Sequence, residues 1–210
     1  MTEELIFPPV DGAEEGIVAL GGDLSTKRLL LAYRSGIFPW YGKDEPIIWW
    51  SPDPRFVLFP PELKVSESMQ RLFRKKAFQV TYDTVFTQVI EYCSTVTRKG
   101  QKDTWITDEM KTAYIEFHKK GYAHSVEVWQ EDKLVGGMYG VILGKCFFGE
   151  SMFHTVDNAS KYGFITFVRK LQEEKFAMVD CQVHTGHLES LGARYIDRNA
   201  FLSILKKHIS

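Results

Sequence analysis

Two short apolar segments of this chain each contain one acidic residue, and this feature restricts the possible folds more than any other. Residues 146–153 and 176–183 are typical of buried strands, and Glu150 and Asp180 interrupt them. A carboxylate buried without a partner would be neutralised or would destabilise the protein, so each acid needs a bonding partner or a chemical task. About thirty residues and one predicted helix separate the two acids. Their occurrence together favours a functional site over two separately satisfied structural acids.

Large apolar residues accompany the two acids. Met138, Phe147, Met152 and Phe167 could wall a pocket near them, and methionine adapts its shape to different ligands. On the second strand, Asp180 and Gln182 alternate onto one face and can act as a unit, whereas the residue between them points to the opposite layer. The pattern predicts an apolar pocket that carries carboxylate and amide groups.

Length and composition are ordinary for a soluble globular protein. The 210 residues suffice for one large domain or for a main domain with a small one. No stretch approaches the ~20 apolar residues of a membrane helix, and residues 1–5 lack the features of a secretory signal. Cys93, Cys146 and Cys181 lie in apolar contexts and do not form a disulfide framework. We therefore expect a cytoplasmic protein with no membrane partner.

The charge balance restricts how the chain can bind nucleic acid. A formal net charge of −1 argues against non-specific coating of a polyanion. Local basic surface is still compatible with this balance, and Arg71, Arg74 and Lys75 could contact a few phosphates. Such a cluster is also typical of a solvated helix face.

The first sixty residues differ from the rest of the chain. All eight prolines lie within residues 1–61, and the clear helix there runs from Ser25, as N-cap, to Gly36. We expect a small, loop-rich N-terminal domain over residues 1–61 and a second domain over residues 62–210.

Residues 62–210 predict regular structure of the α+β class. Ser66, Asp83 and Thr107 can each cap a helix, and residues 124–129 and 134–141 form a predicted hairpin. The Glu150 strand, a helix capped by Asp157 or Asn158, and the Asp180 strand come next. A helix from about residue 187, a strand over 194–196 and a helix from residue 199 complete the chain. This order resembles the core of the GNAT-like acyltransferase fold.

Metal, thiol and coenzyme A chemistry are each disfavoured. Cys181, His184 and His187 have a spacing that could suit a metal, but a fourth ligand is missing. Cys181 is also a poor nucleophile, because the charge of neighbouring Asp180 opposes a thiolate. Coenzyme A enzymes of this fold use a glycine-rich turn before a helix, whereas residues 154–160 contain no glycine. We therefore predict no metal and no cofactor.

Eight motifs occur in one order along the chain. They are ALGGDLS (19–25), GIFPW (36–40), WWSPDPR (49–55), TWI (104–106), AHSVE (123–127), VGGMYGV (135–141), GESMF (149–153) and DCQ (180–182). Together they resemble the bacterial leucyl/phenylalanyl-tRNA–protein transferase family. The resemblance implies transfer of Leu, Phe or less readily Met from aminoacyl-tRNA to proteins that begin with Arg or Lys. Such products enter the N-degron degradation pathway, and we expect the enzyme to act as a monomer.

The same resemblance implies roles for individual residues. Trp40 and Trp105 would line the site of the terminal adenosine, since stacking on aromatic rings recognises an unpaired RNA end. Glu150 would hold the donor α-amino group, and Asp180 with Gln182 would assist the attacking amine or orient the acceptor. Apart from the resemblance, the clustering of Arg71, Arg74 and Lys75 suggests that these residues would contact tRNA phosphates. The substrate pocket would contain Met138, Phe147, Gly149, Met152, Phe167 and Val179.

Two positions depart from the family pattern, and two other functions stay open. His154 stands where Ser is common, and residues 184–186 replace an Asn-containing loop, so acidic acceptor N-termini are conceivable beside basic ones. The missing phosphate loop disfavours a coenzyme A-dependent GNAT acetyltransferase. Retention of Glu150, Asp180 and Gln182 disfavours a tRNA 3′-end binding module without transfer activity.

Overall fold

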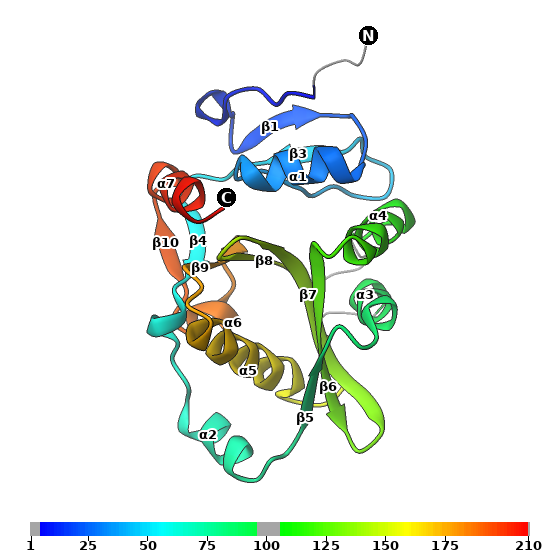
Figure 1. The fold of residues 1–210 in the computed structure, drawn as a ribbon, viewed down its shortest axis with the longest axis vertical. Helices are drawn as coiled ribbons and strands as arrows, with labels where there is room; N and C mark the ends of the chain where they lie inside the picture. Colours follow the sequence, from blue (N-terminus) through cyan, green and yellow to red (C-terminus); the bar gives the residue numbers. More distant parts are fainter. Residues whose placement is uncertain (1–4, 96–105, 210) are drawn as a thin grey trace.

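The computed structural model describes residues 5–95 and 106–209, which form two sheets with helices around them (Figure 1). The strands are β1 (Ile17–Leu20), β2 (Phe38–Pro39), β3 (Ile48–Trp50), β4 (Arg55–Leu58), β5 (Gln79–Tyr82), β6 (Ala123–Gln130), β7 (Lys133–Leu143), β8 (Cys146–His154), β9 (Met178–Gln182) and β10 (Arg194–Ile196). The helices are η1 (Val10–Gly12), α1 (Thr26–Arg34), η2 (Pro60–Glu62), α2 (Glu67–Arg74), α3 (Phe86–Thr95), α4 (Asp108–Lys119), α5 (Ala159–Glu173), α6 (Gly186–Glu189) and α7 (Arg198–His208). Within these ranges, no helix has the length and apolar content needed to cross a membrane.

The N-terminal residues form a three-stranded antiparallel sheet in the order β1-β3-β2. Ser25 starts α1 because its hydroxyl oxygen accepts a hydrogen bond from the Arg28 N–H at 3.4 Å. Gly36 follows the helix at φ +73°, a backbone conformation that favours glycine. The helix predicted from Ser25 to Gly36 is thus confirmed. Trp49 is buried in this sheet, and its indole N–H donates to the Gly21 carbonyl at 2.9 Å.

The larger sheet has seven strands in the order β10-β4-β9-β8-β7-β6-β5. The predicted hairpin corresponds to β6 and β7, and the predicted third strand to β8. β8 and β9 pair in parallel, and the crossover helix α5 connects them. The other named pairs of this sheet are antiparallel. The predicted α+β class and order of elements are confirmed. β4, whose residues 55–58 fall within the segment 1–61, lies between β10 and β9 of the larger sheet.

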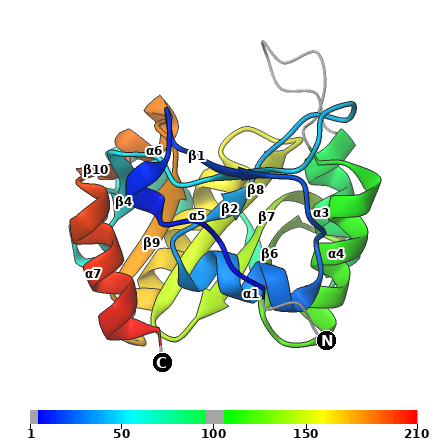
Figure 2. The ribbon, with the colours of Figure 1, turned by 90° about the horizontal axis from the view of Figure 1, so that it is seen from above.

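Helices cover both faces of the larger sheet. In Figure 1, α3 and α4 lie on one face and α5 on the other. Viewed from above, α1 and the small sheet lie over the larger sheet, with α7 at one side (Figure 2). Because neighbouring strand residues point to opposite faces, Phe148 belongs to the core that continues into the N-terminal sheet, and Phe147 to the core beneath α5.

Of the four helix caps predicted in residues 62–210, those at Ser66 and Thr107 are confirmed, whereas Asn158 precedes α5 without a side-chain capping bond. The hydroxyl oxygens of Ser66 and Thr107 each accept a hydrogen bond from the N–H three residues later. The predicted cap at Asp83 is wrong, because α3 begins only at Phe86. The Asp83 carboxylate instead accepts a hydrogen bond from the Ser125 N–H at 2.8 Å. A donor on the neighbouring strand thus replaces the expected helix N–H.

The pairing of β8 with β9 ends early and leaves room for a site. The parallel register covers Cys146–Phe148 against Met178–Asp180. Beyond these residues β8 continues beside β7, while β9 ends at Gln182. Glu150 and Gln182 therefore both lie just past the point where the two strands separate.

Candidate active site

A β-bulge in β8 determines where Glu150 points. Gly149 and Ser151 are opposite consecutive residues of β7, so Glu150 between them has no partner residue on that strand. Bulges re-aim side chains and are common beside active sites. Gly140 permits this close packing, because a Cβ atom there would lie 2.2 Å from the Phe148 carbonyl oxygen.

The Glu150 carboxylate is buried and accepts three hydrogen bonds. The Tyr33 hydroxyl donates to Oε1 at 2.7 Å and the Gln182 side-chain amide donates to the same atom at 2.8 Å. The Tyr114 hydroxyl donates to Oε2 at 3.2 Å, and the two tyrosine hydroxyls also contact each other. Burial raises the pKa of Glu150 to about 7, and the three hydrogen bonds only partly oppose that shift.

Tyr33 and Tyr114 bring two further elements to the site, because Tyr33 lies on α1 and Tyr114 on α4. Burial raises the pKa of both phenols well above their usual range, so each hydroxyl stays protonated and can donate. No functional role was predicted for either residue. A buried tyrosine hydroxyl requires a polar partner, and this requirement is the signal by which they could have been found.

Gln182 occupies a strained turn at the end of β9. The Val183 N–H donates to the Cys181 carbonyl at 2.7 Å and closes a three-residue γ-turn around Gln182. Gln182 has φ +63°, in the left-handed region that side chains such as glutamine rarely adopt. Such a conformation costs about 1–3 kcal/mol and is characteristic of functional sites.

Asp180 is fully buried and bonds only within the protein. Arg55 donates to it through Nε at 2.9 Å and through Nη2 at 2.6 Å. The backbone N–H of Gln182 donates to Asp180 Oδ1 at 2.9 Å. The Asp180 carboxylate therefore joins β4 to the turn that carries Gln182.

Arg55 lies between two aromatic rings. Its guanidinium carbon is 4.7 Å from the ring centre of Phe38, on β2, and 4.5 Å from that of Phe201, on α7. Arg55 and Asp180 are 1% and 0% exposed, so this ion pair is shielded from water. Arg55 belongs to one of the sequence motifs, but no role was predicted for it.

Comparison with known proteins identifies the family. The sequence profile of leucyl/phenylalanyl-tRNA protein transferase matches residues 57–206, and the profile of the N-terminal domain of that transferase matches residues 22–53. The chain belongs to this family. The resemblance found in the motifs is thereby confirmed, and with it the class of enzyme, an aminoacyltransferase.

Named relatives align over nearly the whole chain. The leucyl/phenylalanyl-tRNA–protein transferase of Flavobacterium johnsoniae is 56% identical, over 97% of both chains. That of Syntrophus aciditrophicus is 55% identical, over 98% of this chain and 86% of the relative. That of Pseudomonas fluorescens Pf0-1 is 54% identical, over 98% and 92%.

Solved structures resemble the chain much more distantly. A GCN5-related N-acetyltransferase-like protein from Streptococcus suis has a TM-score of 0.39 at 11% identity and covers 69% of this chain and 57% of its own. L-PGS from Bacillus licheniformis has a TM-score of 0.42 at 10% identity and covers 77% of this chain and 52% of its own.

In this transferase family member, a cavity of about 750 Å³ lies beside Glu150 and Gln182. The bulge in β8 contributes to it, because it places Met152 opposite Met138, on the same side as Phe147. The structure brings together these predicted pocket residues at the cavity wall: Met138, Phe147, Gly149, Met152 and Val179. Phe167 lies behind the wall, where its ring packs edge-on against Phe147 with centroids 4.8 Å apart.

Polar side chains also line the cavity. Among them are His154, Asp157 and His187. Burial lowers the pKa of His187 to about 4, so its ring is neutral at physiological pH. The lining includes Glu150 and Asp157, and no Lys or Arg from the described part of the chain; Asp180 also lines it, but its charge is paired with that of Arg55. A cationic amine therefore fits this cavity better than an anion.

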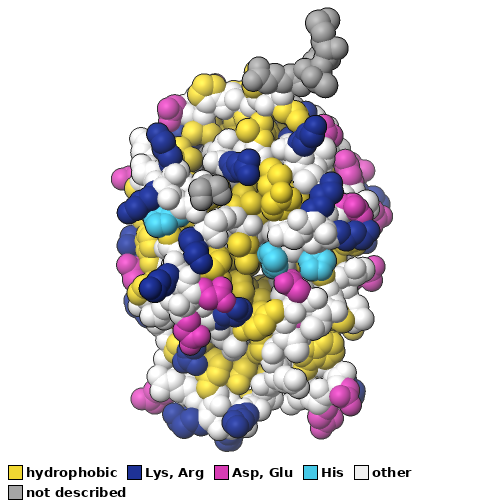
Figure 3. All heavy atoms as spheres, in the orientation of Figure 1, with side chains coloured by type: hydrophobic (Ala, Val, Ile, Leu, Met, Phe, Trp, Pro, Cys, Tyr) yellow, Lys and Arg dark blue, Asp and Glu magenta, His cyan; other side chains and the backbone are white. Residues whose placement is uncertain are grey.

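The predicted RNA contacts lie in different places. Trp40 is at the cavity and is 39% exposed, and its carbonyl accepts a hydrogen bond from the Trp50 indole at 2.6 Å. Trp105 is outside the described residues. Arg71, Arg74 and Lys75 are exposed on and just after α2, at the end of the molecule opposite the small sheet (Figure 1). Basic and acidic side chains are interspersed over the face shown in Figure 3.

Cys181 lines the cavity together with Gln182 and is otherwise buried. It belongs to the core beneath α5, and burial raises the pKa of its thiol well above the ordinary range. His184 stacks on Tyr195, with ring centroids 6.0 Å apart, and contacts Glu189 at 3.1 Å. Among the described residues, no cluster of three or more His, Cys, Asp or Glu could hold a metal.

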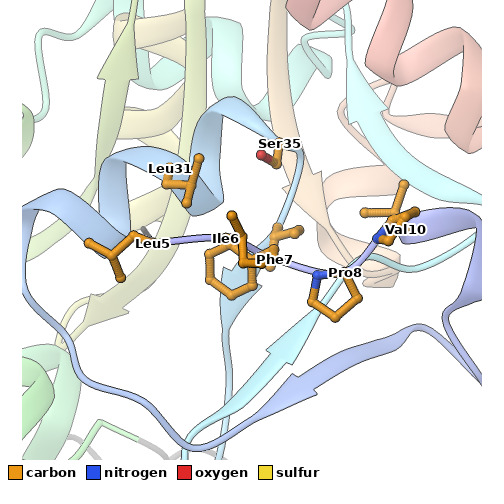
Figure 4. A pocket seen from close by; sticks show the side chains of 9 residues that line it. Leu5, Ile6, Phe7, Pro8, Val10, Leu31 and Ser35 are labelled. Carbon is orange, nitrogen blue, oxygen red and sulfur yellow. The ribbon is translucent and has the colours of Figure 1, made fainter. Parts of the chain in front are cut away.

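A second hollow lies between residues 5–10 and α1 (Figure 4). Its described lining is apolar apart from Ser35 and the backbone, and contains no titratable side chain. Chemistry is therefore concentrated in the cavity beside Glu150.

Proposed function

We propose that this chain transfers Leu, Phe and less readily Met from aminoacyl-tRNA to the N-terminal α-amine of proteins that begin with Arg or Lys. The products would be marked for N-degron proteolysis in the cytoplasm, and the chain would act as a monomer without cofactor or metal. The observation that carries the proposal is the Glu150–Gln182 hydrogen bond at the edge of the apolar cavity.

The cavity is suited to the donor side chain. The cavity offers an apolar surface to a donor side chain that is not branched at Cβ, through Met138, Phe147, Met152 and Val179. The two methionines let that surface adapt to Leu, Phe and Met. A side chain branched at Cβ would be rejected mainly by steric conflict, because a missing methylene group discriminates by only about 1–3 kcal/mol.

Glu150 is the proposed partner of the donor α-ammonium group. Its carboxylate offers about four acceptor sites, of which Tyr33, Tyr114 and Gln182 occupy three. The remaining site can accept a charge-assisted bond from the ammonium group. This contact would distinguish an aminoacyl ester from a simple acyl ester.

Gln182 is the proposed partner of the attacking amine. Because its Nε2 donates to Glu150, its side-chain oxygen is left to accept a bond from the acceptor N–H. The neutral amine attacks the ester carbonyl and forms the C–N bond. As the tetrahedral intermediate collapses, the bond from the carbonyl carbon to the 3′-oxygen breaks and the amine proton passes to that oxygen, which leaves as the tRNA 3′-hydroxyl. An α-amine with a pKa of about 7.7–8.0 is partly neutral already, so positioning can supply much of the rate. Asp180 would act through Gln182.

Two parts of the donor tRNA would be bound, the terminal adenosine and the phosphate backbone. Trp40 and Trp105 would stack against the terminal adenosine, and Arg71, Arg74 and Lys75 would contact phosphates. Trp40 supports this assignment by its partial exposure at the cavity.

A transfer assay tests the proposal. Labelled Leu should move from Leu-tRNA to a peptide beginning with Arg, and Gln182→Ala should abolish most of that transfer. A matched peptide beginning with Glu should react poorly. Acetyl-coenzyme A supplied in place of Leu-tRNA tests the acetyltransferase alternative. Binding of Leu-tRNA without any transfer would contradict the proposal and favour a binding module.

A further inference from the structure

We infer that Arg55 is a positioning residue for aminoacyl transfer, which holds the Gln182 turn in its reactive conformation through Asp180. This inference rests on the proposed function, because it assumes that Gln182 meets the attacking amine. It concerns a side chain that does not itself touch the substrates.

The chain of contacts from Arg55 to Gln182 is continuous. Two guanidinium nitrogens of Arg55 donate to the two oxygens of Asp180, at 2.9 and 2.6 Å. Asp180 Oδ1 also accepts the Gln182 backbone N–H at 2.9 Å. Since both carboxylate oxygens are engaged, fixing the orientation of Asp180 fixes the position of the Gln182 N–H.

Strand pairing alone does not determine this turn. The β4–β9 register pairs Phe56 with Gln182 and Val57 with Asp180, so Cys181 has no partner residue on β4. The Gln182 backbone at φ +63° is strained. Interactions outside the strand ladder hold it: the γ-turn bond from the Val183 N–H and the bond from the Gln182 N–H to the Asp180 carboxylate.

The shape of the Arg55 site suits a guanidinium group in particular. The planar fork of arginine matches a carboxylate with two parallel bonds, and its face stacks on aromatic rings. The Arg55 guanidinium carbon lies over the rings of Phe38 and Phe201, 4.7 and 4.5 Å from their centres. Lysine keeps the charge but lacks the planar fork and the stacking. Arg55→Lys therefore changes the orientation of the Asp180 carboxylate more than it changes the electrostatics of the site.

Arg55 acts through other residues and not on the substrate. It is 1% exposed and is not among the residues that line the cavity, whereas Asp180 and Gln182 are. A substitution at Arg55 should therefore alter the rate of transfer and leave donor binding intact.

The first test measures transfer kinetics with an aminoacyl-adenosine donor and a peptide beginning with Arg. Arg55→Lys should lower kcat at least tenfold and leave the donor KM within twofold. Arg198→Lys is the matched control, because Arg198 is also buried and bonds to the Ser51 carbonyl at 2.8 Å. This control should keep kcat within threefold. An unchanged kcat in folded Arg55→Lys, or an equal loss in the control, would overturn the inference.

A double-mutant cycle separates positioning from a general loss of stability. In the Gln182→Ala background, Arg55→Lys should lower kcat by less than twofold, because the group that it positions is gone. A full tenfold loss in that background would show that Arg55 acts independently of Gln182. Wild-type protein that transfers no amino acid would instead refute the proposed function.

A crystal structure of Arg55→Lys gives a readout independent of activity. Gln182 should leave the left-handed region, and its side chain should lose the bond to Glu150. Retention of φ near the present value would contradict the inference. Asp180→Asn provides a second variant should Arg55→Lys not fold. Its amide group faces the Arg55 donors, so it should show the same loss of kcat and the same dependence on Gln182.

Discussion

The side-chain amide of Gln182 donates to Oε1 of Glu150 across 2.8 Å, although the strands that carry the two residues stop pairing before reaching them. Two backbone irregularities make this contact possible: a bulge at Glu150 and a γ-turn at Gln182. An apolar donor pocket lies on one side of the pair. The geometry thus places Glu150, which is suited to bind the donor, next to Gln182, which is suited to the attacking amine.

Glu150→Gln should weaken binding of the aminoacyl donor. The variant keeps the shape of the side chain but removes the charge that meets the α-ammonium group, and a bond to a charged group contributes about 1.5–3 kcal/mol. We expect at least a tenfold rise in the Kd of a non-reactive aminoacyl-adenosine amide, measured by calorimetry. A matched analogue without the α-amino group serves as control and should bind both proteins alike. Equal loss of affinity for both analogues would contradict the assigned contact.

The same variant should change how stability depends on pH. The pKa of Glu150 is raised to about 7 in the folded protein, from an ordinary value of 4.5, chiefly by burial. Between these pH values the native state keeps a proton that the unfolded chain has released, so this contribution to stability is lost as pH rises. The change amounts to about 3 kcal/mol, from ~1.4 kcal/mol per pKa unit.

Urea unfolding of both proteins at pH 5 and pH 8 measures this effect. The free energy of unfolding of the wild type should fall relative to that of Glu150→Gln over this interval. A difference between the two proteins that stays constant with pH would contradict the raised pKa.

Much of the fold could be predicted because its signals are local. The helix from Ser25 to Gly36 has a capping residue and a glycine at its end. The hairpin has two strand-like segments on either side of a polar turn. The wrong cap at Asp83 shows the limit of such signals. Its carboxylate bonds to Ser125, which is distant in sequence and becomes a neighbour only when the strands pair.

The acids of the site could be predicted, but not their partners. Glu150 and Asp180 are conspicuous because each interrupts an apolar strand. Tyr33 and Arg55 contact them from elements more than one hundred residues away, and no local pattern specifies such pairs. The bulge and the γ-turn could not be predicted from the sequence either, because they arise from how the strands pack together.

Met152→Ala should relax the choice of donor. Met152 lines the cavity opposite Met138, so its removal enlarges the space near the donor side chain. We expect kcat/KM for Leu to fall roughly tenfold, corresponding to about 1–3 kcal/mol, with a smaller loss for larger donors. The measurement is transfer of Leu, Phe and Ile from their tRNAs. Phe167→Leu is the control behind the wall, and it should lower stability more than it alters selectivity. Reversed behaviour of the two variants would place Phe167 in the pocket instead.

RNA contacts should separate by their response to salt. Neutralising Arg71, Arg74 or Lys75 removes at most one phosphate contact each, so the slope of log Kd against log salt concentration should change by about one unit at most. Trp40→Ala should weaken binding of a minimal aminoacyl-adenosine, because base stacking contributes about 1–3 kcal/mol, and should leave the slope unchanged. Filter binding of Leu-tRNA at several salt concentrations measures both effects. If the variants of Arg71, Arg74 or Lys75 lost binding of the minimal substrate, these charges would contact the terminal adenosine and not distant phosphates, and the assignment would be wrong.

Cys181→Ala should retain most of the transfer activity. The Cys181 side chain belongs to the core beneath α5 and borders the cavity, and burial raises the pKa of its thiol well above the usual range. Direct attack of the amine on the ester requires no thiolate, so no acyl-enzyme should accumulate. Truncation leaves a small cavity that costs about 1 kcal/mol, visible as a lower melting temperature. Single-turnover assays followed by intact-protein mass spectrometry check both points. An inactive Cys181→Ala that folds and binds Leu-tRNA, together with an active Asp180→Asn, would replace direct transfer by a thioester route.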